Sequence, residues 1–584
     1  MKETSRYSDG DLCYSVNDII HSVFARKVRM VRVEIYLCIA AILWAFALPH
    51  FGSRWFGRIE SNFTRFAQRR ALSVVAVGIL AVVARLAVLP MLPVPAPEVH
   101  DEFSYLLASD TFVHGRLTNP PHAMWIYFDT FHVNQHPTYA SIYPPAQGAM
   151  LALGQLLGHP WIGVLLSVSV MCGAVLWALQ GWLPPRWAFF GGLLALLRLA
   201  ISSYWMNSYW GGAVAAIGGA LVIGALPRIL HFHRARDAVI LGLGAGILAN
   251  SRPFEGFIFC LPVVAVLTLW LFRRRSPSWR EALQRVVLPF CAVILLCGLF
   301  MGYYNWRLTG NPGLFPYVLN VQSRFAVPPL AWQKTVPPFH FLNPQFDTFY
   351  NEWMPSTAWL MGRPDSLGQI ALTTGVNVWT FGRFFVWPDL LLPVVALPWL
   401  LRGRRGRLLV VQIVVCFAGF LLVAWFQPHY AAPLTATTLI LIAQGFRYIR
   451  LWRFHARPIG AALVRAAVLV ALLLAPFHRY YVQLFPAVDR RARVAAQIES
   501  NSGTDLVIVR YAPNHNSREE WVYNRADIDR AKIVWAREIP GVNMQPLLDY
   551  FRGRNVWLVE PDENPPKLYR MAIQKVGMDQ NASN

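Results

Sequence analysis

The sequence is poor in charged residues, and acidic residues are the scarcest of them. Asp, Glu, Lys and Arg together make up 14% of the 584 residues, with 31 acidic against 53 basic side chains. Hydrophobic residues make up 55%, and there are 23 tryptophans. This balance excludes an ordinary soluble enzyme and is typical of a polytopic membrane protein with some soluble mass attached.

Cysteines are few, and none lies where a disulfide would be expected. Six of the seven fall in apolar segments, and Cys13 lies in the polar N-terminal tail. We therefore expect neither a structural disulfide nor a cysteine-based metal site. The sequence also has no convincing internal repeat, which a transporter would be expected to contain.

The net charge of +22 does not indicate a nucleic-acid partner. The arginines cluster between apolar runs, where the preference of basic residues for the cytoplasmic side of a membrane accounts for them. We therefore expect membrane lipids as partners, and no nucleic acid.

Eleven apolar runs predict membrane spans. They lie at about 71–93, 160–182, 186–205, 209–226, 237–251, 253–272, 285–304, 388–402, 407–426, 430–446 and 460–477. A further apolar segment at 33–50 has basic residues on both sides, and it fits a span, a re-entrant piece or an interfacial helix. The sequence thus predicts a polytopic α-helical protein with about 11 to 12 spans.

The basic residues in the links between spans predict on which side of the membrane each link lies. Counting spans from Arg70 puts the arginine-rich links near 228–236, 273–275, 402–407 and 447–457 on the cytoplasmic side. The same parity puts the long loops 95–158 and 305–387 and the C-terminal tail on the outer side. In that tail, 506–509 and 556–559 predict buried strands with a helix at 547–552 between them. We predict an N-terminal cytoplasmic or membrane-associated extension at 1–70, a transmembrane domain at 71–480 and a small external α/β domain at 498–584.

A pair of carboxylates, Asp101 and Glu102, stands where the chain first emerges from the membrane on the outer side. In a helix that begins here, Asp101 and Tyr105 share a face, whereas Glu102 points about 100° away. The two carboxylates therefore suit two different tasks better than one shared proton. The alternative is a solvated loop with an acidic helix start.

A transferase that takes a sugar from a polyprenyl phosphate would use residues of this kind. It needs a base for the acceptor and cations for the departing phosphate. Asp101 is our candidate base. Arg252, followed by a proline that starts a new helix, is the candidate phosphate ligand, with snorkelling or pairing with Glu255 as the alternative. His429 and Tyr430 begin a span on the same side and could reach the same phosphate, or could cap a helix or anchor it at the interface.

Other polar and aromatic residues of the outer segments are candidate substrate ligands. They are His100, Tyr105, Tyr143, Gln147, Asn207, Tyr209, Trp210 and Glu255. The histidines of the first outer loop form no helical i, i+4 pair, so we assign no metal ligand, and a divalent metal stays open as a cofactor.

The order of these features resembles the GT-C glycosyltransferases. The shared order is a first span, the external Asp101-Glu102 pair, paired short spans, a late external loop and an outer C-terminal domain. Over residues 71–480 the chain is most similar to the bacterial aminoarabinose-transferase and protein O-mannosyltransferase branch. The resemblance implies that Asp101 acts in catalysis on the acceptor side, that Glu102 supports the site and that external cations hold the lipid phosphate. The chain lacks a tail that matches the eukaryotic protein mannosyltransferases.

The prediction is therefore an integral membrane glycosyltransferase. It would move a hexose or pentose from a polyprenyl-phosphate donor to a lipid, glycan or protein acceptor on the outer face, and the resemblance implies the bacterial inner membrane. A transporter or flippase, a ligase or polymerase of lipid-linked glycans, and a non-catalytic assembly subunit are the alternatives. A ligase or polymerase would rely on Arg and His without a carboxylate base after the first span.

Overall fold

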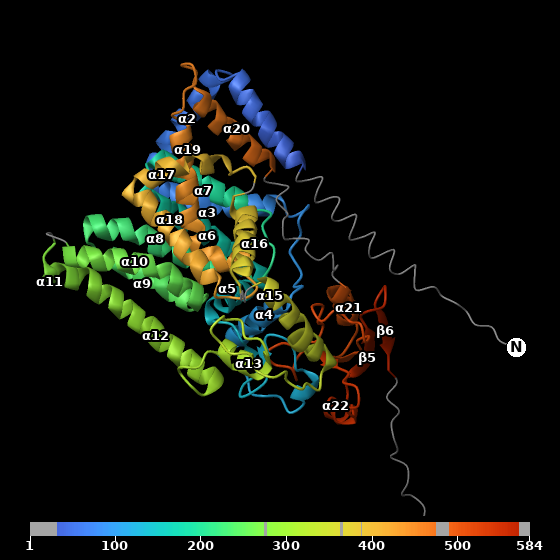
Figure 1. The fold of residues 1–584 in the computed structure, drawn as a ribbon. Coiled ribbons are helices and arrows are strands. Elements are labelled where there is room, and N and C mark those ends of the chain that lie inside the picture. Colours follow the sequence, from blue (N-terminus) through green and yellow to red (C-terminus); the bar gives the residue numbers. More distant parts are fainter. Residues whose placement is uncertain (1–31, 274–276, 362–365, 387, 475–489, 572–584) are drawn as a thin grey trace, which may run out of the picture.

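The chain is a polytopic α-helical membrane protein with a small α/β region at its C-terminal end (Figure 1). The computed structural model describes residues 32–273, 277–361, 366–386, 388–474 and 490–571. The first 31 residues of the predicted N-terminal extension, the end of the last apolar run at 475–477 and the final part of the predicted external domain after 571 lie outside the described residues.

Every predicted apolar run contains a helix. Five of the described helical stretches are long and apolar enough to cross a membrane: α3 (Arg70–Ala87), α6 (Pro160–Trp182), α8 (Ala213–Phe232), α10 (Pro253–Arg273) and the continuous α11–η2–α12 stretch (Trp279–Thr309). The other six runs hold α7 (Pro185–Leu199), α9 (Ala235–Ala249), η4 and α17 (Leu392–Arg402), α18 (Arg404–Phe420), α19 (Thr435–Ile449) and α20 (Ile459–Leu474).

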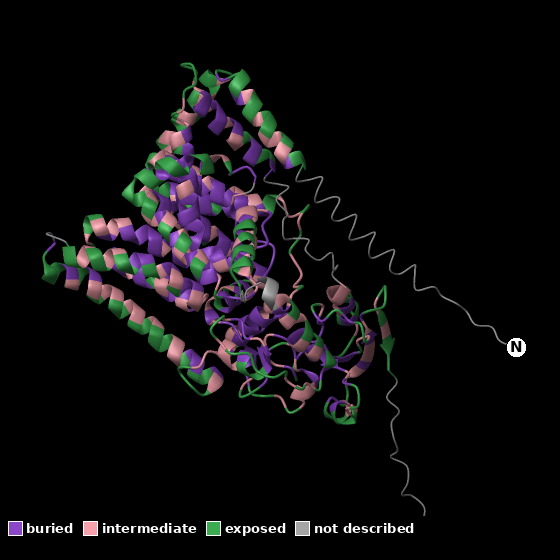
Figure 2. Ribbon diagram, viewed as in Figure 1, coloured by how far each residue is buried: buried purple, intermediate pink, exposed green. Residues whose placement is uncertain are grey.

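The centre of the helical bundle is α6 and α8, whose residues are largely buried (Figure 2). Helix α6 packs against α3, α7 and α8, and α8 packs against α9. Glycine permits a close approach here, because a Cβ on Gly219 of α8 would lie 2.2 Å from the Pro433 carbonyl oxygen. Helix α12 is different, because Leu295, Leu296 and Leu299 are all exposed. Apolar side chains exposed along a helix of this length fit contact with lipid.

The predicted outer loop at 305–387 contains several helices. They are α13 (Pro316–Arg324), α14 (Pro344–Phe346), η3 (Asp347–Trp353), α15 (Met354–Met361) and α16 (Leu367–Phe385). Helix α16 packs against α18 and against η5 (Pro428–Leu434), so this part of the region joins the bundle. The side of the membrane on which the region lies stays a prediction.

The loop at 95–158, predicted to lie on the outer side, is an ordered unit. After α3 come α4 (His100–Val113), η1 (Trp125–Tyr127), the antiparallel pair β1 (Val133–Asn134) and β2 (Ala140–Ser141), and α5 (Pro145–Leu156). Helices α4 and α5 pack on each other, and α5 packs on α6. Gln155 of α5 hydrogen-bonds Ser109 and Asp110 in the C-terminal half of α4, so the loop is fixed to the bundle through α5.

The C-terminal region is a four-stranded mixed sheet with two helices. It consists of α21 (Arg490–Glu499), β3 (Asp505–Val509), β4 (Ile533–Arg537), α22 (Gln545–Tyr550), β5 (Asn555–Glu560) and β6 (Lys567–Arg570). The strand order is β4-β3-β5-β6, with β3 parallel to both neighbours and β6 antiparallel to β5. The predicted strands at 506–509 and 556–559 are confirmed as β3 and β5, and the predicted helix at 547–552 is α22, shifted by two residues at each end.

Candidate active site

Asp101 is held at the start of α4 by a tyrosine and a histidine. Its Oδ1 accepts a hydrogen bond from the Tyr143 hydroxyl, and His132 Nδ1 lies 3.7 Å from the same oxygen. Tyr143 precedes α5, and His132 is the residue before β1. The Asp101 side chain is 24% exposed. The carboxylate is therefore fixed in orientation and still open to an incoming molecule.

Tyr143 and His132 surround the carboxylate in their neutral forms. Burial raises the pKa of Tyr143 well above its ordinary value, and the charge of Asp101 adds to this. Burial also lowers the pKa of His132, against the opposing effect of Asp101. The Tyr143 hydroxyl lies 3.1 Å from His132 Nδ1. Because a phenol has one proton, donation to Asp101 leaves its oxygen to accept from the Nδ1–H tautomer of His132.

Arg252 approaches the same region from the link between α9 and α10. Its guanidinium carbon lies 4.7 Å from the centroid of the Tyr430 ring, and its Nη1 lies 4.0 Å from Glu255 Oε1. It also interacts electrostatically with Tyr105 and Tyr143. The Arg252 side chain is 17% exposed. A cation and a carboxylate thus border one group of tyrosines.

Four tyrosines, here called the tyrosine wall, lie between Asp101 and Arg252: they are Tyr105, Tyr143, Tyr317 and Tyr430. The Tyr105 and Tyr143 rings stack with centroids 4.4 Å apart. Tyr317, from α13, interacts electrostatically with Asp101, Arg252 and Tyr430. The structure therefore brings together six of the predicted site residues, namely Asp101, Tyr105, Tyr143, Arg252, Glu255 and Tyr430. His132 was not selected from the sequence and lies among them.

His429 lies behind Tyr430, inside the bundle. The Tyr204 hydroxyl and His429 Nδ1 are 2.9 Å apart, and the Trp210 ring meets the imidazole edge-on at 4.7 Å between centroids. His429 is 2% exposed and its imidazole meets the Tyr430 ring edge-on at 4.9 Å between centroids, so the arrangement suits His429 to supporting Tyr430.

The Glu102 carboxylate accepts hydrogen bonds from three backbone N–H groups. Its Oε2 accepts hydrogen bonds from the N–H groups of Glu98 (2.7 Å) and Val99 (3.0 Å), and its Oε1 accepts one from the N–H of Tyr209 (2.9 Å). Burial raises the pKa of Glu102 to about 7, although these hydrogen bonds oppose the shift. Glu102 therefore ties the start of α4 to the link between α7 and α8.

Three further predicted residues hold the same link. Gln147 Nε2 donates to the Tyr209 carbonyl at 2.8 Å, and the Tyr209 hydroxyl donates to the Pro95 carbonyl at 2.8 Å. The Asn207 side-chain oxygen accepts from Arg85 of α3 at 2.9 Å. Gln147, Asn207 and Tyr209 thus brace the segments around α4, and their described hydrogen bonds are made to the chain itself.

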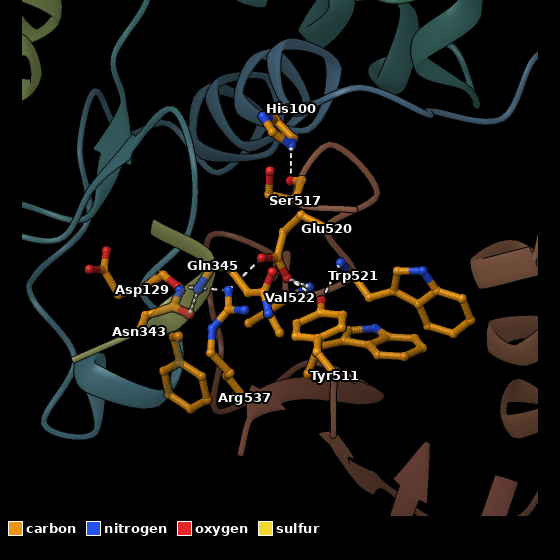
Figure 3. Close-up of polar contacts among 12 residues, drawn as sticks. His100, Asp129, Asn343, Gln345, Tyr511, Ser517, Glu520, Trp521, Val522 and Arg537 are labelled. Atoms are coloured by element: carbon orange, nitrogen blue, oxygen red, sulfur yellow. Dashed lines mark hydrogen bonds and ion pairs between the residues drawn. The ribbon is translucent and has the colours of Figure 1, made fainter. Parts of the chain in front are cut away.

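His100 points toward the C-terminal region (Figure 3). Its Nε2 lies 3.0 Å from the Ser517 carbonyl oxygen, and its ring stacks on Phe131 at 4.4 Å between centroids. Burial lowers its pKa to about 3. Further along α4, Asp110 accepts a hydrogen bond from the Ala526 N–H at 2.8 Å. The C-terminal region therefore contacts α4 at His100 and at Asp110, while Asp101 faces the tyrosine wall.

Metal ligands are sparse around Asp101. Asp101 and His132 are two potential ligands within reach of each other. In the described part of the chain, no group of three or more His, Cys, Asp or Glu side chains is placed to hold a metal ion. The donor set around Asp101 thus does not form a metal centre from these described residues alone.

Comparisons with known proteins found structural matches. No protein-family model and no curated protein matches the chain. Among solved structures, the chain is similar to ArnT from Cupriavidus metallidurans bound to undecaprenyl phosphate, with 14% identity, a TM-score of 0.45 and coverage of 83% of this chain and 92% of that one. It is also similar to the Archaeoglobus fulgidus oligosaccharyltransferase in complex with Zn and sulfate, with 14% identity, a TM-score of 0.45 and coverage of 75% of this chain.

The chain spans about three fifths of the archaeal protein, because the match covers 60% of that chain. The likeness in both cases is one of general arrangement. The fold and the site define the present chain as an integral membrane protein with a charged, tyrosine-lined site where α4, α5, α10 and η5 meet.

Proposed function

We propose that the protein is a glycosyltransferase that moves a sugar from a polyprenyl-phosphate donor to an acceptor on the outer face of a bacterial inner membrane. One observation carries the proposal: Asp101 and Arg252 border the same tyrosine wall beside helices long enough to cross a membrane. A lipid-linked donor needs a site of this kind, because its tail stays among apolar helices while its phosphate and sugar reach a polar boundary.

In this proposal Asp101 is the general base. The acceptor nucleophile gives its proton to the Asp101 carboxylate as its heteroatom bonds to the anomeric carbon, and the bond from that carbon to the phosphate oxygen breaks. Tyr143 and His132 hold the carboxylate in place by the contacts described above. A base positioned in this way contributes about 10²–10⁴-fold to the rate.

Arg252 receives the leaving group. The departing phosphate carries the bonding electrons away as a stable anion, so the step calls for a cation more than for a general acid. Arg252 lies at a break between α9 and α10, and Tyr430 and Glu255 set the position of its guanidinium. Planar guanidinium groups suit two-point contact with phosphate oxygens. A divalent metal bound together with the donor would add charge stabilisation at the same phosphate.

The test is sugar transfer by the purified chain in lipid, from a panel of polyprenyl-phospho-sugars to lipid, glycan and peptide acceptors. Asp101→Asn should lower transfer by about 10²–10⁴-fold while donor binding persists. Arg252→Gln should lower transfer by about 10²–10³-fold and weaken donor binding. Asp527→Asn is the matched control, because that carboxylate is 34% exposed and pairs only with nearby Arg530 among the described contacts. Full activity of Asp101→Asn would refute the assignment of the base.

A further inference from the structure

Helix α2 (Ser53–Gln68) lies at the opposite end of the bundle from the C-terminal sheet (Figure 1). One of its faces is fixed to the protein. Phe63 and Phe66 pack on Phe189 of α7, with ring centroids 4.7 Å and 5.3 Å away. Glu60 pairs with Arg450 and Arg465, the latter at 3.1 Å. These contacts set the rotation of α2 about its axis and so decide which residues face outward.

The outward face carries three arginines. Arg54, Arg58 and Arg65, together with Gly57, Ser61 and Asn62, line a shallow open depression of about 470 Å³. At about 100° per residue the three arginines fall within an arc of roughly 40°. All three are exposed, and none pairs with a carboxylate in the described part of the chain. Arg65 donates a hydrogen bond to the Asn62 side chain. The residues that line the depression are rich in hydrogen-bond donors, and none of them is acidic.

An exposed tryptophan adjoins the arginines. Trp55 is 61% exposed and lies between the arginine face and the packed face on the helical wheel, whereas Ile59, which is 44% exposed, falls between the packed positions of Phe66 and Phe63. A helix with arginines on one side and an exposed tryptophan next to them matches the surface of an interfacial helix. Its tryptophan would sit at the level of the lipid headgroups. The arginines would then lie where headgroup phosphates are.

We propose that this face of α2 binds the headgroup of an anionic phospholipid. The lipid phosphate and its net negative charge would occupy the depression between Arg54, Arg58 and Arg65, and the acyl chains would lie against Trp55 and Ile59. The rigid attachment of α2 through Glu60 and Phe63 makes this a preorganised site and not a loose basic tail. The proposal does not depend on the proposed transfer reaction, because α2 is remote from Asp101.

The experiment is a lipid titration of the purified full chain, read by native mass spectrometry. Dioleoylphosphatidylglycerol is the probe, with dioleoylphosphatidylcholine and inorganic phosphate as comparisons. The variant R54Q/R58Q/R65Q should weaken retention of phosphatidylglycerol by roughly 100-fold, since each basic residue near an anionic lipid contributes about fivefold. R54K/R58K/R65K keeps the charge and should retain most of the binding. R404Q/R405Q/R407Q removes three exposed arginines elsewhere and should change it little.

Three results would overturn the proposal. The first is equal loss in the two glutamine triples, which would make the effect one of net charge. The second is equal retention of phosphatidylcholine by the native chain, which would make it one of apolar contact. The third is displacement of the lipid by inorganic phosphate alone at matched concentration, which would make the ligand a free anion. Trp55→Ala should lower retention of phosphatidylglycerol without altering its preference over phosphatidylcholine.

Discussion

The buried ion pair between Glu520 and Arg537 lies where the C-terminal region meets the segments that hold Asp129 and Gln345 (Figure 3). The two side chains are 1% and 2% exposed, and Arg537 Nη2 lies 2.5 Å from Glu520 Oε2. The other Glu520 oxygen accepts from the Tyr511 hydroxyl and from the Val522 N–H, at 2.5 and 2.7 Å. Arg537 Nε and Nη1 are buried without a hydrogen-bond partner among the described residues. The carboxylate is thus well satisfied and the guanidinium is not.

This imbalance predicts how the pair responds to substitution. Glu520→Gln leaves a buried arginine without its counter-charge, which costs about 3–5 kcal/mol of stability. Removing both charges also removes the cost of burying the unpaired N–H groups, so an apolar replacement of the pair is often neutral or stabilising. We therefore expect the double variant E520Q/R537M, whose amide oxygen can still accept from Tyr511 and Val522, to be closer to the native chain in stability than Glu520→Gln alone.

Hydrogen exchange of the strands β3 and β4 measures this directly, because exchange of their amides reports the free energy of local opening. The exposed pair between Arg510 and Glu538 on the same sheet is the matched control, and Glu538→Gln should cost at most about 1 kcal/mol. The reasoning is refuted if Glu520→Gln opens the strands no more than Glu538→Gln does, or if the double variant is as unstable as the two single losses added together.

Three further substitutions test the packing and the supports of α4. Gly163→Ala should destabilise the purified chain by at least about 1–3 kcal/mol in thermal unfolding, because the new Cβ would lie 1.9 Å from a backbone oxygen of α5. Gly298→Ala is the control and should be neutral, because a Cβ at Gly298 meets nothing within 4 Å. The pKa of His100 is lowered to about 3 in the folded chain, so between about pH 3 and 6.5 the unfolded chain binds a proton that the folded chain does not. The free energy of unfolding should therefore rise with pH in this range, by up to about 1.4 kcal/mol per pH unit. His100→Phe should remove this share of the acid sensitivity in pH-dependent unfolding. Glu102→Gln should cost about 1–3 kcal/mol, since its NH₂ group would face a backbone N–H, and exchange should quicken at residues 98–99 or 209.

The helices could be predicted from the sequence wherever apolar residues ran on without interruption. All eleven such runs hold a helix, because hydropathy and the need to satisfy the backbone in lipid point to the same structure. Helix α16 was missed for a physical reason: it buries Thr373 and Asn377 in its interior-facing side, which breaks the apolar run. Strand β4 was also missed, since Ile533–Arg537 places a charged residue, Arg537, at a fully buried position whose partner Glu520 is remote in sequence.

The site could be predicted only as a set of residue types at one end of the protein. Asp101 and Arg252 were identifiable because charged residues next to apolar spans are costly and seldom incidental. His132 carried no such signal. Its position depends on a left-handed backbone, with φ of 57°, directly before the β1–β2 pair. A tertiary turn of this kind leaves no periodicity in the sequence, and only the fold places His132 beside Asp101.

The relation between Asp101 and Glu102 follows from helix geometry. Neighbouring residues on a helix point about 100° apart, so one carboxylate faces the tyrosine wall while the other turns to the backbone of Glu98, Val99 and Tyr209. The three N–H groups occupy both oxygens of Glu102, so this carboxylate holds the backbone around the start of α4 in place. This geometry supports the proposal that Asp101 accepts the proton, whereas Glu102 orients α4. Inserting one residue before His100 would move Asp101 to the position of Glu102 and Glu102 to that of Phe103, which would turn Glu102 away from those N–H groups and detach α4 from its anchor.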